Sequence, residues 1–126
     1  MLIVDTDVLI WYLRGNEKAF KTIENLESFS ISVVTYMELV QGMRNKKELN
    51  NLRQALHAWN ATILYITEEI SAKAMFAVEQ HFLSHSMQLA DALIGSTAVA
   101  HGLPLLTGND THYKIMKDVQ VNKFRH

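Results

Sequence analysis

The sequence predicts an α/β domain built on a mainly parallel central sheet of four to five strands. Short apolar or β-branched runs alternate along the chain with longer segments of helical periodicity, and this alternation is typical of parallel sheets. The first run, residues 2–4, is apolar at every position, as in a strand buried on both faces. The chain has 126 residues, of which 48% are hydrophobic and 20% charged, so we expect residues 1–126 to form one domain.

The first half of the chain predicts two strands and four helices. The strands are the apolar or β-branched runs at residues 2–4 and 30–34. The helices, in chain order, are expected at residues 8–13, 16–27, 36–43 and 46–59. Asn16 and Thr35 are the expected N-caps of the second and third helices, because their side-chain oxygens can accept hydrogen bonds from free backbone amides.

The second half predicts three strands and two long helices. The strands are expected at residues 62–66, 105–106 and 119–121, and the helices at residues 67–81 and 86–101. Thr67 and Ser86 are the expected N-caps, and Gly102 ends the last long helix. A loop at residues 107–111 and a short helix precede the final strand. Ligands of such sheets bind beyond the carboxyl ends of the strands, so the residues that follow each strand are the first functional candidates.

Composition excludes several classes of function. Twelve Lys and Arg against thirteen Asp and Glu give a formal charge of −1, which excludes a polybasic protein that binds nucleic acid through overall charge. The chain has no cysteine, which excludes disulfides, zinc–thiolate sites and thiol catalysis. We expect no secretory leader and no membrane span, which needs about 20 apolar residues, and therefore a cytoplasmic protein.

Three carboxylates, Asp5, Glu38 and Asp91, stand in apolar segments. Apart from Asp7 beside Asp5, each is the only charged side chain in its segment, and no Lys or Arg lies there to pair with it. A buried carboxylate must be paired, neutralised or bound to a metal. The three acids are therefore candidate functional residues.

The predicted topology places these acids near one edge of the sheet. Asp5 ends the first strand, and Glu38 lies on the first turn of the helix after the second strand. Asp91 lies about one turn into its helix, where Gly95 and Ala98 on the same face allow close packing. Converging carboxylates form a hard-oxygen site that selects Mg²⁺ or Mn²⁺ rather than zinc or copper.

Each acid also has a structural alternative. Asp5, Thr6 or Asp7 can cap the first helix, and capping is the role that we expect for Asp7. Glu38 can satisfy backbone groups at the start of its helix. Asp91 lies too far inside its predicted helix to act as a cap. Taken together, with no cationic partner nearby, the three acids favour a metal site.

Four segments in order resemble the PIN domain, in the form found in VapC-type toxins of bacterial toxin–antitoxin pairs. They are Leu2–Leu9, Glu38–Gly42, Leu89–Ile94 and Leu105–Asn109, and the resemblance extends from Met1 to about Val121. It implies a three-layer α/β/α fold and a Mg²⁺- or Mn²⁺-dependent endoribonuclease that cleaves RNA phosphodiester bonds and inhibits translation. It also implies a homodimer and a cognate antitoxin protein, through which alone the complex binds operator DNA.

The resemblance also assigns site residues by position. The matching positions are Asp5, Glu38 and Asp91 for the three central acids, Thr107 for a hydroxyl that orients an acid, and Asn109 or Asp110 for the fourth polar position. In the mechanism that this implies, Asp5 and Asp91 contact the metal directly. Glu38 binds the metal through water, or holds and deprotonates the attacking water.

RNA must approach an acidic site, so cations are expected at its rim. The candidates all follow elements that begin near the site: Arg14, Lys18, Lys21, Arg44, Lys46 and Lys47. The alternative for each is a solvated surface position. The aromatic and thioether side chains that flank the acids either stack on bases or belong to the core: Trp11, Tyr12, Tyr36 and Met37.

The sequence leaves two other functions open. Asp5 and Asp7 after a strand also resemble the nucleophile motif of haloacid-dehalogenase-like phosphatases, although the lysine and the acidic pair of that family are not evident. A catalytically inactive PIN-like binding module is the second alternative, and the intact acids argue against it.

His81 and His85 have the spacing of two metal ligands on a helix, but two ligands are too few, and we assign them to the surface.

Overall fold

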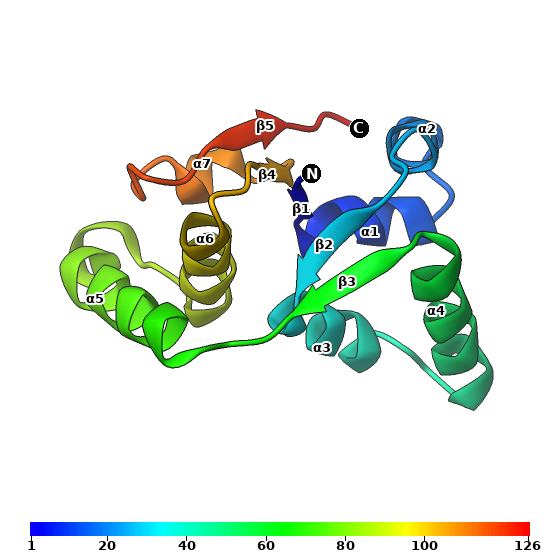
Figure 1. The fold of residues 1–126 in the computed structure, drawn as a ribbon, viewed down its shortest axis with the longest axis horizontal. Helices are drawn as coiled ribbons and strands as arrows, with labels where there is room; N and C mark the ends of the chain where they lie inside the picture. The colour runs from blue at the N-terminus through cyan, green and yellow to red at the C-terminus, as the bar shows by residue number, and fades with distance from the viewer.

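A five-stranded parallel sheet runs through the centre of the computed structural model, which describes all 126 residues (Figure 1). The strands are β1 (Ile3–Val4), β2 (Phe29–Ser32), β3 (Ala61–Leu64), β4 (Leu105–Thr107) and β5 (Val121–Lys123). Their order in the sheet is β3-β2-β1-β4-β5, and every pairing is parallel. The predicted α/β class and parallel sheet are confirmed.

Helices cover both faces of the sheet and complete three layers (Figure 1). They are α1 (Thr6–Leu13), α2 (Glu17–Glu24), α3 (Val33–Gln41), α4 (Lys46–Ala58), α5 (Glu68–His85), α6 (Leu89–His101) and α7 (Asp110–Tyr113). Buried residues of α1, α2 and α4 share one core cluster, whereas α6 and α7 contribute to a cluster on the other face. The helix α5 packs on the outer side of α6. No helix is both long and apolar enough to cross a membrane.

The strand β1 lies in the middle of the sheet and is buried on both faces. Val4 packs in the core cluster of α1, α2 and α4, and its neighbour Ile3 packs in the cluster of α6 and α7. Successive side chains of a strand point to opposite faces, so a strand that is covered on both sides needs an apolar residue at every position. This explains the continuous apolar run at the start of the sequence and places Asp5 at the carboxyl edge.

Three capping predictions are confirmed. The Asn16 side chain accepts a hydrogen bond from Ala19 N at 2.9 Å, and Thr67 Oγ1 accepts one from Ile70 N at 3.2 Å. Gly102 ends α6 with a positive φ of 62°, a conformation that glycine adopts at little cost.

Two other capping predictions are wrong. The N-cap of α3 is Ser32 rather than Thr35, because Ser32 Oγ accepts the hydrogen bond of Val34 N at 3.1 Å. Ser86 ends α5 in a left-handed conformation with a φ of 52°, and α6 begins after Gln88 without a side-chain cap. Glu38 therefore lies on the second turn of α3 rather than the first, and Asp91 lies on the first turn of α6 rather than about one turn inside it, so both predicted positions are wrong.

Candidate active site

The site begins where the adjacent strands β1 and β4 end. Val4 pairs with Leu106 in the sheet, so the residues that follow, Asp5 and Thr107, lie side by side. Thr107 Oγ1 donates a hydrogen bond of 2.7 Å to Asp5 Oδ2, and Thr6 N donates one of 2.8 Å to Asp5 Oδ1. Only 3% of Asp5 is exposed. Asp5 therefore caps α1 and is fixed by Thr107 at the same time.

Asp7 does not cap α1, so the expectation for this residue is wrong. Asp7 lies inside the first turn of the helix, and its Oδ2 accepts a hydrogen bond of 2.9 Å from Gly108 N. A Cβ atom at Gly108 would lie only 2.7 Å from Asp7 Oδ2, so this approach requires glycine. The second oxygen of Asp7, Oδ1, is buried without any hydrogen-bond partner.

The two neighbouring aspartates lack a compensating cation. Burial, and secondarily the charge of Asp7, raise the pKa of Asp5 to about 6, although hydrogen bonds from Thr107 and Thr6 act in the opposite direction. Burial also raises the pKa of Asp7. Neither carboxylate forms an ion pair. The local electrostatics therefore favour a bound cation.

Glu38 joins this region through Thr6. Thr6 Oγ1 lies 2.7 Å from Glu38 Oε1 and 2.9 Å from Thr35 Oγ1. Since the Thr6 hydroxyl has one proton, it can donate to Glu38 while it accepts from Thr35. Glu38 is the sixth residue of α3 and therefore does not cap that helix, so the capping alternative is wrong for this acid.

Asp91 makes two side-chain contacts from α7. Tyr113 donates from its hydroxyl to Asp91 Oδ1 at 3.4 Å, and His112 Nδ1 lies 3.3 Å from Asp91 Oδ2. Burial, followed by the charges of Asp5 and Asp91, raises the pKa of Tyr113, so its phenol stays protonated. Because the charges of both Asp5 and Asp91 act on Tyr113, its phenol lies near two acids that are distant in the sequence.

The position of Tyr113 depends on a glycine of α6. A Cβ atom at Gly95 would lie 2.8 Å from Met116 Sδ and 3.4 Å from Tyr113 Cδ1. The expectation that Gly95 allows α6 to pack closely is confirmed. The absence of a side chain at Gly95 lets Tyr113 and Met116 lie close against α6.

Asn109 and Asp110 have different surroundings. Asp110 Oδ1 lies 2.9 Å from Arg125 Nη1, and Lys123 Nζ lies 4.0 Å from its other oxygen, so the pKa of Asp110 is below its ordinary value. Asp110 is thus already compensated, unlike Asp5. Asn109 N donates to Thr107 Oγ1 at 2.9 Å, and the Asn109 side chain makes no capping bond.

The structure connects the predicted acids but does not bring all of them into one cluster. No group of three or more His, Asp or Glu side chains lies close enough together to hold a metal ion. The expected convergence of Asp5, Glu38 and Asp91 is therefore incomplete, and Thr6 and Tyr113 link the acids instead. Sequence reasoning did not single out Tyr113, for which the only signal was its place three residues after Asp110.

The predicted rim cations are only partly free. Arg44 and Lys21 pair with acids of their own helical surfaces, Arg44 with Glu48 at 2.7 Å and Lys21 with Glu17 at 3.2 Å. Arg14 lies over the ring of Trp11 at 5.9 Å. Arg44 and Lys21 are therefore solvated surface residues, which is the alternative to a role in RNA binding.

A family model described as "PIN domain" matches residues 2–118 of the sequence. This chain belongs to the PIN domain family. The match covers the segments around Asp5, Glu38, Asp91 and Thr107, so the family resemblance of the sequence is confirmed. It leaves the haloacid-dehalogenase-like alternative without support.

Curated relatives of this PIN domain carry the name VapC. The protein "Ribonuclease VapC10" from Mycobacterium tuberculosis is 32% identical over 95% of this chain and 91% of its own length. The protein "Ribonuclease VapC1" from Methanocaldococcus jannaschii is 29% identical over 93% of this chain and 82% of its own length. Within the family, the chain is thus similar to VapC ribonucleases.

Solved structures agree with this PIN fold. A toxin–antitoxin complex from Klebsiella pneumoniae contains a chain with a TM-score of 0.80 and 25% identity, covering 98% of this chain and 100% of that one. The VapBC2 structure from Rickettsia felis, bound to a DNA fragment from its promoter, gives a TM-score of 0.78 at 20% identity, with 98% of each chain covered. The three-layer α/β/α fold is therefore shared with these proteins.

Proposed function

We propose that this PIN domain is a divalent-metal-dependent endoribonuclease that cleaves RNA phosphodiester bonds. The observation that carries the proposal is the pair of neighbouring aspartates at the carboxyl edge of the sheet, the buried Asp5 and the half-buried Asp7, neither of which forms an ion pair. The VapC ribonucleases among the relatives support RNA as the substrate.

The donor set fits Mg²⁺ or Mn²⁺. Carboxylate oxygens are the preferred ligands of these ions, and Asp7 Oδ1 is a buried carboxylate oxygen without a hydrogen-bond partner. Asp5 and Asp91 would hold the metal, with Glu38 binding through water and Asp7 Oδ1 available as a further oxygen. When bound, the metal supplies a water of lowered pKa and neutralises charge that develops on the phosphate.

The surrounding side chains orient the acids. Thr107 and Thr6 N fix both oxygens of Asp5, so this carboxylate has one orientation. Tyr113 stays protonated and therefore remains a hydrogen-bond donor toward Asp91. Glu38, turned toward the site by Thr6, can hold the attacking water and accept its proton. Asn109 is the better candidate for the fourth polar position, since Asp110 is paired with Arg125.

We further propose that the chain is the toxin of a VapBC-type pair and acts by inhibiting translation. The cognate antitoxin protein would be its inhibitory partner, and operator DNA would be contacted only through that antitoxin. The similarity to a toxin–antitoxin complex supports this assignment. The site would act in the cytoplasm, and residues 1–126 would form one nuclease domain.

We also propose a homodimer. The outer surface of α5 exposes the large apolar side chains of Met75, Phe82 and Leu83, and α3 exposes that of Met37. Exposed apolar side chains of this number are typical of surfaces covered by a partner. Light scattering at tens of micromolar should give twice the monomer mass, since association follows mass action.

The activity is tested with purified protein, free of antitoxin, and single-stranded RNA. We expect cleavage with millimolar Mg²⁺ or Mn²⁺, no cleavage in EDTA, and no turnover of para-nitrophenyl phosphate. Turnover of that phosphate ester would indicate a phosphatase instead. RNA binding without cleavage under all metal conditions would indicate an inactive binding module and contradict the proposal.

A further inference from the structure

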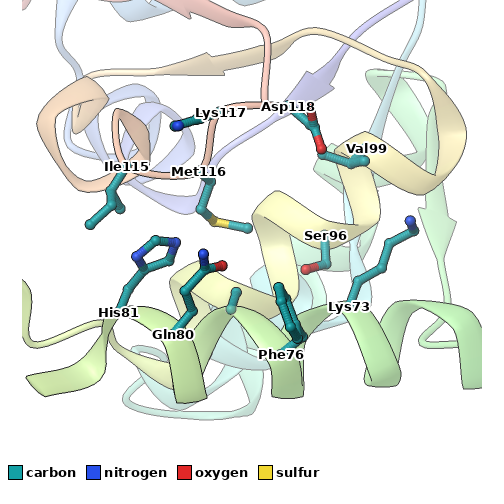
Figure 2. A pocket seen from close by; sticks show the side chains of 11 residues that line it. Lys73, Phe76, Gln80, His81, Ser96, Val99, Ile115, Met116, Lys117 and Asp118 are labelled. Carbon is teal, nitrogen blue, oxygen red and sulfur yellow. The ribbon is translucent and has the colours of Figure 1, made fainter.

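A cavity of about 360 Å³ lies between α5, α6 and the segment that follows α7 (Figure 2). We name it the α5 cleft. Its polar lining consists of Lys73, Gln80, His81, Ser96, Lys117 and Asp118. These residues come from three separate parts of the chain, and none of them has a role in the site described above.

The wall of the cleft contains a buried hydroxyl without a partner. Ser96 is only 1% exposed, and its Oγ forms no hydrogen bond. Figure 2 shows Ser96 on α6 with its hydroxyl toward the cleft, between Phe76 and Met116. A buried polar group of this kind is costly unless something bonds to it. A ligand with a polar atom in the cleft would provide that bond.

The charges of the cleft favour an anion. Lys73 and Lys117 form no ion pair anywhere in the structure, and the one acid of the lining, Asp118, forms none either. Two lysines against one acid leave an excess of positive charge. Phe76, which is 64% exposed, adds a ring on which a planar group can stack.

The cleft continues toward the carboxylates. A neighbouring cavity of about 300 Å³ is lined by Asp91, His112, His85 and Ile115, and Ile115 also lines the α5 cleft. His81 of the cleft and His85 of the neighbouring cavity are one turn apart on α5, with ring centroids separated by 6.2 Å. Along α6, the step from Asp91 to Ser96 is about 7.5 Å, at 1.5 Å per residue.

We propose that the α5 cleft binds a nucleotide of single-stranded RNA on one side of the cleaved bond. Lys73 and Lys117 contact its phosphates, Ser96 supplies a hydrogen bond, and Phe76 stacks on its base. A cationic groove with an aromatic surface is the usual binding site for single strands. This inference rests on the proposed function, because it assigns a path to the substrate of that site.

The test measures RNA binding apart from cleavage. Fluorescently labelled single-stranded RNA is titrated with the full chain in EDTA, and anisotropy is recorded over a range of salt concentrations. Lys73→Ala and Lys117→Ala should each weaken binding about fivefold at about 0.1 M salt and lower the salt slope by about 0.7, the value for one phosphate contact on a single strand. Lys114→Ala is the matched control, since Lys114 is exposed, carries the same charge and does not line the cleft.

Ser96→Ala separates ligand binding from packing. The substitution removes a hydroxyl that has no partner, so the melting temperature of the free protein should not fall, whereas RNA affinity should drop about threefold. If Ser96 serves only the packing of α6, RNA affinity will stay at the wild-type value.

The outcomes distinguish this inference from the proposed function. Wild-type binding and cleavage of RNA, combined with unchanged affinity of the Lys73 and Lys117 variants, would overturn the role of the cleft alone. Equal losses for these two variants and the Lys114 variant would also overturn it, because they would reflect overall charge. If the wild-type chain neither binds nor cleaves RNA, the proposed function itself fails.

Discussion

The Asp5→Asn substitution removes a buried charge and leaves the size of the side chain unchanged. Burial and Asp7 raise the pKa of Asp5 from 3.8 to about 6, so the folded protein holds this proton more tightly than the unfolded chain does. Between these two values the folded state binds more protons, and the free energy of unfolding must fall as pH rises. The stabilisation that the raised pKa of Asp5 gives the folded state is fully present below pH 3.8 and is lost above about pH 6.

The size of this effect follows from the two pKa values. One pKa unit corresponds to about 1.4 kcal/mol, so the wild-type chain should lose about 3 kcal/mol across this window. Asn has no such titration. The variant does lose an acceptor for the Thr107 hydroxyl, 2.7 Å from Asp5 Oδ2, at a cost of about 1 kcal/mol. We therefore expect it to be more stable than the wild type by about 2 kcal/mol near pH 7.5, and less stable by about 1 kcal/mol near pH 3.5.

The assay is urea unfolding in EDTA at several pH values, with Asp118→Asn as a control at an exposed acid without an ion pair. The difference in free energy of unfolding between the Asp5 variant and the wild type should change sign with pH, whereas that of the control should stay constant. A constant deficit of the Asp5 variant at every pH would refute the reasoning, because it would show that the charge of Asp5 is already compensated.

Three further perturbations address the same site. Mn²⁺ at millimolar concentration should raise the melting temperature of the wild-type chain, because a ligand that binds only the folded state stabilises it, and Asp91→Asn should reduce this rise and abolish RNA cleavage. Tyr113→Phe removes the hydrogen bond to Asp91 and should weaken Mn²⁺ binding about tenfold in calorimetric titrations. Tyr12→Phe is the control, because its hydroxyl bonds to Glu24 and to none of the site's acids, and this variant should bind Mn²⁺ as the wild type does. Gly108→Ala should lower the free energy of unfolding by about 1–3 kcal/mol in urea, because its Cβ would meet Asp7 Oδ2 at 2.7 Å; an unchanged midpoint would contradict this.

The elements that the sequence predicts well are those with a local signal. The continuous apolar run at residues 2–4 predicts a central strand, and Asn16, Thr67 and Gly102 mark helix ends through bonds within their own turns. Ser32 and Thr35 are both plausible caps by residue type. Their distinction depends on the pairing of β2 with β1 and β3, which a local pattern does not contain.

The same limit applies to the site. The acids Asp5, Glu38 and Asp91 were predictable because charges are conspicuous in apolar segments. Their partners were not, since Tyr113 contacts Asp91 across 22 positions of the sequence and Thr6 contacts Glu38 across 32. A tyrosine in a segment of mixed polarity gives no sign that its hydroxyl is directed at a carboxylate. Partners of this kind become visible only when the chain is folded.

Gly95 of α6 influences the geometry of the active site although it takes no part in the proposed chemistry. A Cβ atom at this position would meet the flexible end of the Met116 side chain at 2.8 Å, which can rotate away, and would only touch Tyr113 Cδ1 at 3.4 Å, whereas the side chain of a larger residue would press on the segment that holds the phenol. A larger residue here would therefore change the spacing between two acids without touching either one. Substitutions at this single position, from Ala upward in size, would form a graded series. Across this series the spacing between the acids would change while the charges of the site stay the same.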